Sequence, residues 1–178
     1  MFLEKLLEVP KKKALKLIVL IGLVAFVILT VLGGMINPSS PNGILDYEFA
    51  LTSSRVLAIF NAWGTTGKQQ VAFGIYMDFF YIIAYGALIF GCLLIAARKL
   101  EGKFQTIGLY MTIMPVIAGV CDVIENVNLL LMITDNTFVT SASPLVAALC
   151  ASIKFSIIIA CILFFVVEII VIAIRRKK

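Results

Sequence analysis

The stretch that decides the fold is residues 144–174, which read PLVAALCASIKFSIIIACILFFVVEIIVIAI. Its only charged side chains are Lys154 and Glu168. A helix needs about 20 predominantly apolar residues to cross the hydrocarbon core of a bilayer. The stretch is therefore long enough and apolar enough to be a transmembrane helix.

Three further apolar stretches have the same character and are separated by more polar segments. The turn from Arg98 to Lys103 is too short to hold another element, so the helices on either side of it should be antiparallel neighbours. Pro115 lacks a backbone N–H and should kink the third helix by leaving a carbonyl unpaired. We predict an all-α integral membrane protein, a four-transmembrane-helix bundle forming one domain over residues 1–178, with helices at about 14–35, 68–97, 104–133 and 144–174.

The composition agrees with this class and argues against nucleic-acid binding. Hydrophobic residues make up 62% of the chain and charged residues 14%, against about 45–50% and about 25% in soluble domains. Most of the 15 Lys and Arg residues stand beside the apolar stretches, where they would contact anionic lipids on the cytoplasmic side. We therefore predict a multi-pass plasma-membrane protein with both termini cytoplasmic. The basic flanks are Lys5, Lys11, Lys12, Lys13 and Lys16, then Arg98, Lys99 and Lys103, then Arg175, Arg176, Lys177 and Lys178.

Residue types that commonly carry metal or redox chemistry are absent or uninformative. The chain has no histidine, which is the commonest metal ligand. Carboxylates alone would suit Ca²⁺ or Mg²⁺, but an intramembrane lysine competes for them. We predict no metal and no cofactor. The four cysteines lie inside apolar stretches as small hydrophobes and form no paired motif: Cys92, Cys121, Cys150 and Cys161.

The long loop before the second helix has its own helical pattern. We predict an amphipathic helix at about 53–63 in this first extracytoplasmic loop, ended by Gly64. Two placements stay open: a re-entrant or interfacial helix that forms a lid on the outer face, or a surface loop with an anchoring helix. The charged loop residues Asp46, Glu48 and Arg55 either stay in solvent or fold over the site described next. The apolar stripe of the loop consists of Leu45, Phe49, Val56, Phe60 and Trp63.

Four ionisable side chains fall deep inside the predicted spans: Asp78, Asp122, Glu125 and Lys154. A charge at the bilayer centre costs at least about 2.5–3.5 kcal/mol, so such groups usually face the bundle interior and serve a function. Counted from the outer ends of their helices at about 1.5 Å per residue, all four reach a similar depth. We expect them to meet in one site. Helical spacing adds Tyr81 and Tyr85 on the side of Asp78, and Asn126 beside Glu125.

One lysine does not neutralise three carboxylates. Like charges and loss of hydration both disfavour the ionised acid, so we expect at least one of the three to carry a proton at neutral pH. The structural alternative is that Lys154 pairs with one acid while the others only hold helices together. Glu168 lies nearer the cytoplasmic end of its helix, and we expect it to extend toward the inner membrane surface.

The order of these parts resembles two groups of membrane proteins. The second helix contains Tyr76-Met77-Asp78-Phe79-Phe80-Tyr81, and the third contains Asp122-Val123-Ile124-Glu125-Asn126. This is similar to small bacterial four-helix membrane proteins with an Asp-x-x-Glu-Asn motif in the third helix. In length and number of spans the chain also resembles the emopamil-binding (EXPERA) family, which encloses sterol-like ligands over intramembrane acids. That resemblance implies an architecture and not a reaction, because the histidine of its isomerase members is absent.

Three functions fit these features, and whether the protein is an enzyme stays open. The first is a site that binds or modifies a lipid-like or amphiphilic molecule entering from the outer leaflet. Lys154 would be its counter-ion, and Tyr81, Tyr85 and Asn126 would orient the ligand. The second is a small proton-coupled transporter acting as an oligomer such as a homodimer. The third is a membrane assembly subunit whose charges pair with a partner's helix. Expected partners are membrane lipids and a small amphiphilic ligand, with no nucleic acid.

Overall fold

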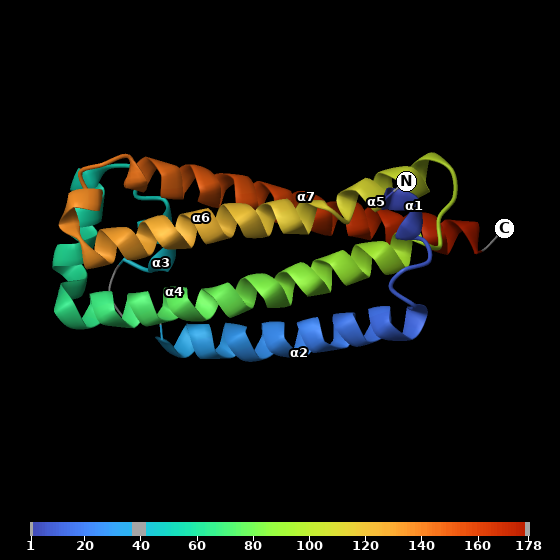
Figure 1. Ribbon diagram of the computed structural model, residues 1–178, viewed down its shortest axis with the longest axis horizontal. Coiled ribbons are helices and arrows are strands. Elements are labelled where there is room, and N and C mark those ends of the chain that lie inside the picture. The colour runs from blue at the N-terminus through green and yellow to red at the C-terminus, as the bar shows by residue number, and fades with distance from the viewer. Residues whose placement is uncertain (1, 37–41, 177–178) are drawn as a thin grey trace. The chain divides into compact units, whose positions relative to one another are not determined.

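The structure, a computed structural model, describes residues 2–36 and 42–176 (Figure 1). Within these ranges every regular element is helical, which confirms the all-α prediction. The predicted end of the first helix at Pro38 and Pro41 lies outside the described residues. The elements are α1 (Phe2–Lys5), α2 (Lys12–Ile36), α3 (Ile44–Glu48), α4 (Ser53–Ala97), α5 (Lys103–Met111), α6 (Met114–Thr134), the 3₁₀ turn η1 (Asn136–Phe138) and α7 (Ser143–Arg175).

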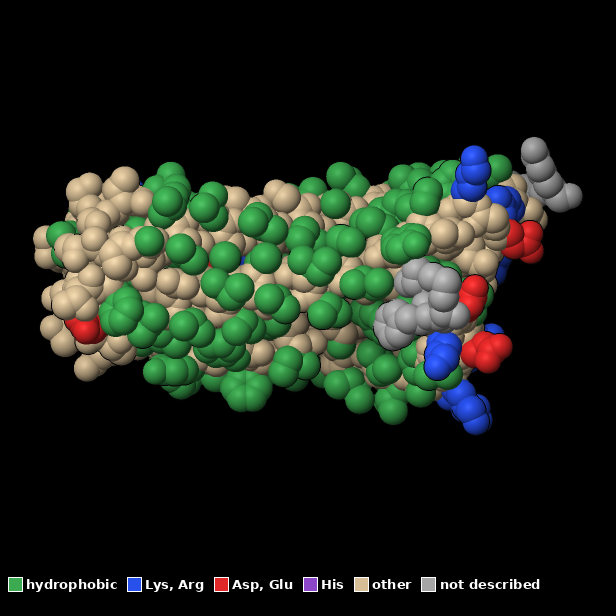
Figure 2. Space-filling view, turned by 45° about the horizontal axis from the view of Figure 1, so that its top comes forward, with side chains coloured by type: hydrophobic (Ala, Val, Ile, Leu, Met, Phe, Trp, Pro, Cys, Tyr) green, Lys and Arg blue, Asp and Glu red, His purple; other side chains and the backbone are tan. Residues whose placement is uncertain are grey.

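Four of these helical segments are long and apolar enough to cross a membrane, as predicted. In the most apolar windows of α2 and α7 only 11% of the residues are buried by the rest of the protein. Figure 2 shows hydrophobic side chains covering much of the visible face. So much contiguous apolar surface is unfavourable in water and is compatible with lipid. The four segments are Lys12–Met35, Ser53–Ala97, Lys103–Thr134 and Ser143–Arg175.

Two residues interrupt the long helices where the sequence predicts it. Gly64 has φ 61° and ψ −165°, so it divides α4 into an amphipathic part before it and a spanning part after it. Glycine adopts a positive φ without the Cβ clash that other residues suffer. Before Pro115, α5 ends at Met111 and α6 begins at Met114. The predicted effect of the proline is therefore present as a short break between two helices.

The contacts divide the chain into two compact units, and each of the four long segments contributes to both. Unit 1 consists of Met1–Phe26, Ile83–Gly119 and Phe155–Lys178. Unit 2 consists of Val27–Ile82 and Val120–Lys154.

In unit 1 a glycine allows α2 and α4 to approach closely. A Cβ added at Gly22 would lie 2.9 Å from the backbone nitrogen of Leu88 and 3.1 Å from the carbonyl oxygen of Ala84. Only a residue without a side chain fits such a contact between backbones. Added at Gly33 or Gly34, a Cβ would meet no heavy atom within 4 Å in the described part of the chain, so these two glycines form no such contact.

Arg98 fastens the N-terminal segment to the end of α4 in unit 1. Its Nε and Nη2 donate to the carbonyl oxygen of Leu6 at 2.8 and 2.6 Å, and its Nη1 donates to that of Pro10 at 2.9 Å. Leu6 also packs against an apolar cluster that includes Leu15 and Leu94. The short amphipathic N-terminal segment is thus held by both polar and apolar contacts.

Unit 2 is built around the loop segment, which we define as residues 42–63. The side chain of Tyr47 packs against the rings of Phe60 and Trp63, with centroid distances of 5.3 Å to each. The hydroxyl of Tyr47 donates to the carbonyl oxygen of Leu129 at 2.8 Å, so α3 lies beside α6 (Figure 1). Trp63 Nε1 donates to the carbonyl oxygen of Asn42 at 2.7 Å. The Tyr47 bond thus holds the loop segment against α6, and the Trp63 bond ties the two ends of the segment to each other.

The predicted apolar stripe of the loop segment is only half correct. Val56, Phe60 and Trp63 are buried, as expected of an amphipathic helix. Leu45 and Phe49 are exposed instead. The chain leaves the helical conformation between α3 and α4, so the two helices have no common face. In α3 the buried face carries Tyr47 and Glu48.

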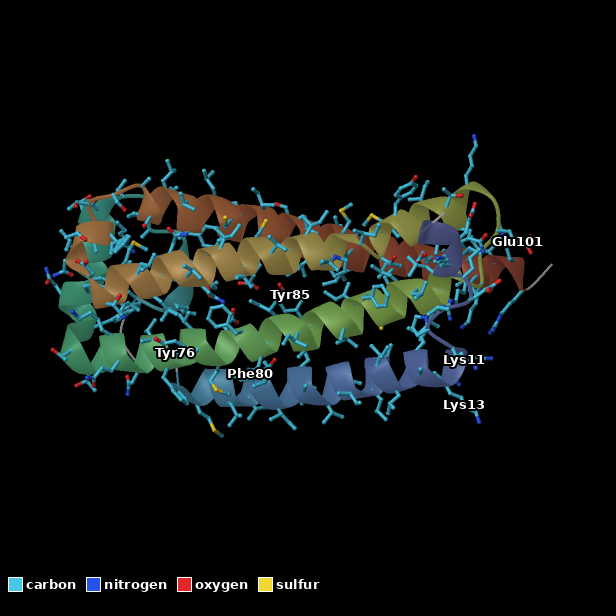
Figure 3. The ribbon with its side chains drawn as sticks, viewed as in Figure 1. Lys11, Lys13, Tyr76, Phe80, Tyr85 and Glu101 are labelled. Carbon is cyan, nitrogen blue, oxygen red and sulfur yellow. The ribbon has the colours of Figure 1, made fainter. Side chains whose placement is uncertain are left out.

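The basic flanks predict the orientation of the helices, and two exposed positions allow a test. Glu101 lies in the turn between α4 and α5, at the same end of unit 1 as Lys11 and Lys13 (Figure 3). Thr140 lies between η1 and α7. In a background without the four native cysteines, Thr140→Cys should react with an impermeant thiol reagent added to intact cells, and Glu101→Cys should react only after lysis. Labelling of Glu101→Cys in intact cells would reverse the assignment.

Candidate functional site

Lys154 lies at the centre of the candidate site in unit 2. Its Nζ donates to Asp122 Oδ1 at 2.8 Å and lies 2.9 Å from Glu125 Oε2. A third carboxylate oxygen, Glu48 Oε2, lies 4.0 Å away. The predicted contact of Lys154 with acids of another candidate span is therefore present, and the loop contributes a further acid.

The side chains of this cluster are almost completely removed from solvent. Glu125 is 0% exposed, Asp122 2%, Lys154 5% and Glu48 8%. Asp122, Glu125 and Asn126 share one face of α6 because they are three or four residues apart. Lys154 comes from α7 and Glu48 from α3. Two elements separated in sequence, α3 and α6, thus place their carboxylates around the ammonium group of α7.

Asp78 of α4 joins this cluster through an amide. Asn126 Nδ2 donates to Asp78 Oδ2 at 2.7 Å, and Asn126 is itself 2% exposed. Asp78 also lies close enough to Asp122 for the two carboxylates to repel each other. The neighbouring Tyr76 and Phe80 (labelled in Figure 3) are 55% and 62% exposed and cover the other side of α4. The polar face of α4 therefore belongs to the site, while its aromatic face does not.

The site has a surplus of acids and a shortage of hydrogen-bond donors. Glu48, Asp78, Asp122 and Glu125 surround a single lysine. Among the described residues, neither oxygen of Glu125 accepts a hydrogen bond, and Glu48 Oε2 accepts none. The short distance from Glu125 to Lys154 is thus an ion-pair contact without favourable hydrogen-bond angles. Four ionised carboxylates here would leave three uncompensated negative charges, which a low dielectric strongly disfavours.

Glu48 is the one acid of the cluster outside the candidate spans. Burial raises the pKa of Glu48 from 4.5 to about 7, against the opposing effect of Lys154. The charges of Asp78 and Asp122 contribute to this rise in pKa. The protonation state of Glu48 therefore changes near neutral pH.

Two predicted ligand-binding residues of the loop lie apart from the cluster. Asp46 Oδ2 accepts from the backbone N–H of Gly43 at 3.0 Å, at the start of α3. Its Oδ1 lies 3.5 Å from Arg55 Nη2, and both side chains are largely exposed. Of the three loop charges, only Glu48 turns inward. Residues two apart in a helix lie on different faces, which separates Asp46 from Glu48 on α3.

The two tyrosines also separate. Tyr81 accepts a hydrogen bond from Thr30 Oγ1 at 3.3 Å within unit 2. Tyr85 is buried and belongs to unit 1. Their predicted role in orienting a ligand stays a prediction.

Glu168 is buried within the protein and does not extend outward. It belongs to unit 1, is 0% exposed and contacts Gly108 of α5. The expectation of a solvent-seeking side chain was wrong because Gly108 leaves space between the helices, which the carboxyl fills.

The sequence analysis did not identify the role of Tyr47, which holds the loop segment against α6. Its partner is the backbone carbonyl of Leu129, and a backbone carbonyl leaves no signal in the residue pattern. Among the described residues no group of His, Cys, Asp and Glu has the arrangement of a metal site.

Comparison of the chain with protein-family models, curated proteins and solved structures finds no match.

Removing the lysine should be far more harmful than removing an exposed charge. Lys154→Met leaves buried carboxylates without their cation and should lower the free energy of unfolding by about 3–5 kcal/mol. Lys154→Met combined with Asp122→Leu should recover a large part of this loss, because Glu125 can then bury as the neutral acid. Arg55→Met breaks the exposed pair with Asp46 and should cost at most about 1 kcal/mol. Thermal and denaturant unfolding of the protein in detergent measures all three, and equal losses for Lys154→Met and Arg55→Met would contradict the arrangement.

Proposed function

We propose that unit 2 forms an intramembrane site that binds the head group of an amphiphilic molecule entering from the outer leaflet of the plasma membrane. One observation carries this proposal: a single buried ammonium group contacts three carboxylates, one of which comes from a loop rather than from a span. Four basic or acidic groups at one buried position exceed what helix association needs.

The surplus of acid selects the chemistry of the ligand. A structural ion pair needs one acid, and each further buried carboxylate costs free energy unless a proton or a cation accompanies it. Asp78 is half-buried. Among the described residues of the cluster, only the side-chain amide of Asn126 donates a hydrogen bond to the Asp78 carboxylate. A head group with a positive charge or several hydrogen-bond donors would supply what the site lacks. We therefore propose that the ligand is an amphiphile with an amine head group, and that Asp78, Asp122 and Glu125 accept its hydrogen bonds. Lys154 would partly neutralise these acids when no ligand is bound.

The loop segment would act as the lid of this site. It is held to α6 by the hydroxyl of Tyr47 and brings Glu48 to 4.0 Å from Lys154. This contact is longer than those of Asp122 and Glu125, so it is the weakest of the three. Leu51, between α3 and α4, has φ 60°, which is unfavourable for a side chain other than glycine. Release of α3 would relax this residue and withdraw Glu48, opening a path for the head group.

The groups of the cluster are suited to proton transfer. Carboxyl, ammonium and amide side chains can give, take or orient a proton. The same surplus of acids favours a proton-coupled transporter as the second candidate, because proton binding would neutralise the cluster. Uptake of an amine into vesicles that depends on a pH gradient would support the transporter, whereas saturable binding without uptake would support the binding site.

The lid should loosen as pH rises. The docked segment keeps Glu48 with a pKa of about 7, against 4.5 for an exposed side chain. The docked form binds the proton of Glu48 more tightly than the released form does. Docking of the loop segment is therefore most stable below about pH 4.5 and becomes less stable as pH rises toward about 7. Trp63 is the only tryptophan and packs in this segment, so its quenching by acrylamide reports docking.

Quenching of Trp63 in lipid nanodiscs should increase between about pH 5 and about pH 8. Glu48→Gln removes the titrating group and should give a flat profile with the segment docked. Asp46→Asn, which alters an exposed carboxylate on the same helix, should retain the slope. A wild-type profile without slope, or a sloping Glu48→Gln profile, would be inconsistent with Glu48 as the titrating group of the lid.

The ligand class can be tested with the same fluorophore. Dodecylamine should change Trp63 emission saturably in nanodiscs, and dodecanoate of equal chain length should not. Asp78→Asn removes one carboxylate while keeping its hydrogen bonding, and should weaken dodecylamine binding by about tenfold, equivalent to about 1.4 kcal/mol. Asp46→Asn is the matched control and should bind normally. Equal responses to both amphiphiles, or equal losses in the two variants, would argue against the proposed site.

A further inference from the structure

Glu168 is a second buried acid, separate from the Lys154 cluster. It lies in the part of α7 that belongs to unit 1 and is 0% exposed. Neither of its oxygens has a hydrogen-bond partner in the described part of the chain. An ionised carboxylate in this condition is strongly unfavourable, because it has lost its hydration and gained no donor or cation.

The space for this carboxyl comes from a glycine. A Cβ built at Gly108 of α5 would collide with Glu168 Oε1 and would lie 2.9 Å from the Cβ of Ala97 in α4. The carboxyl thus occupies a position that any other residue at 108 would close. Because Glu168 is completely buried and its carboxyl lies against Gly108, no space remains beside the carboxyl for a hydrated or organic cation.

The charged residues on the helices around Glu168 either bond to other partners or lie more than one helical turn away. On α7 the next charged residue is Arg175, about two turns further along. Arg98, next to Ala97, donates all three of its described hydrogen bonds to carbonyls of the N-terminal segment. Lys103 begins α5, more than a turn before Gly108. Within the described ranges, none of these three forms an ion pair with Glu168.

A buried hydroxyl at the end of α5 offers no donor either. Thr112 directly follows α5, one turn after Gly108, and is fully buried. Its Oγ1 donates to the carbonyl oxygen of Leu109 at 2.7 Å. The hydroxyl hydrogen of Thr112 is therefore used in a bond to the last turn of α5.

We propose that Glu168 and Gly108 form a proton-binding site in which the carboxyl is held as the neutral acid. The ligand is a proton, because the site is too closed for a larger cation and holds no fixed positive charge. Proton binding converts the least favourable group of unit 1 into a neutral side chain that an apolar contact tolerates. This site is independent of the amphiphile site in unit 2.

Infrared spectroscopy of the full-length protein in nanodiscs tests the protonation state directly. The difference spectrum of wild type minus Glu168→Gln at neutral pH should contain the carbonyl stretch of a protonated carboxyl and no carboxylate bands. Wild type minus Glu101→Gln is the matched control, since Glu101 is exposed in a turn, and should contain carboxylate bands only. Carboxylate bands in the Glu168 difference spectrum would overturn the proposal.

The unfolding temperatures of variants at Glu168 and Gly108 provide a second test of the site. Glu168→Gln exchanges one neutral group for another and should leave the unfolding temperature nearly unchanged. Gly108→Ala should lower it, and Gly108→Ala with Glu168→Ala should recover the part of the loss caused by the carboxyl, while the contact with the Cβ of Ala97 remains. A large loss in Glu168→Gln would show that the carboxyl is charged and paired. A Gly108→Ala variant as stable as wild type would show that the carboxyl does not occupy the contact. Either result rejects this site without affecting amine binding in unit 2.

Discussion

The contact of Lys154 with Asp122 and Glu125 imposes the main constraint on this protein. An unpaired ammonium or carboxylate in a low dielectric is so unfavourable that α6 and α7 must present these groups to each other. Distances of 2.8 and 2.9 Å meet this requirement. Once α6 is oriented by Asp122, the helical repeat turns Glu125 and Asn126 to the same side, and Asn126 then engages Asp78 of α4. A single ion pair thereby determines the rotation of three helices within unit 2.

The same constraint explains why a loop reaches into the cluster. Lys154 still has a third direction open after it contacts two acids, and Glu48 approaches it from α3 at 4.0 Å. The cost of burying Glu48 is offset by apolar and polar contacts of its neighbours. Tyr47 packs against two aromatic rings and donates to a backbone carbonyl. The loop segment thus combines a firmly held aromatic residue with a weakly held acid, a combination suited to a closure that can be released.

Several features were predictable from residue order because they depend on local chemistry. Apolar length predicts the four long helices. The positive φ of Gly64 and the break before Pro115 follow from the covalent structure of these two residues. Equal depth along antiparallel helices predicts the meeting of Lys154 with Asp122 and Glu125, since helical rise converts residue number into distance. The inward turn of Glu48, the exposed pair of Asp46 with Arg55 and the burial of Glu168 depend instead on partners far away in the sequence.

By itself, the amino-acid sequence determined the helical class, the number of long apolar helices and the charged residues within them, because backbone hydrogen bonding and hydrophobicity act within a segment. Only the tertiary structure decided which charges touch. Glu48 and Asp46 stand two residues apart and have the same charge, yet one is buried beside Lys154 and the other is exposed. Likewise the structure, and not the composition of α7, decided that Glu168 is enclosed, because the space it fills is the missing side chain of Gly108. In both cases the outcome depends on which surfaces come together, and packing between distant segments leaves no local pattern.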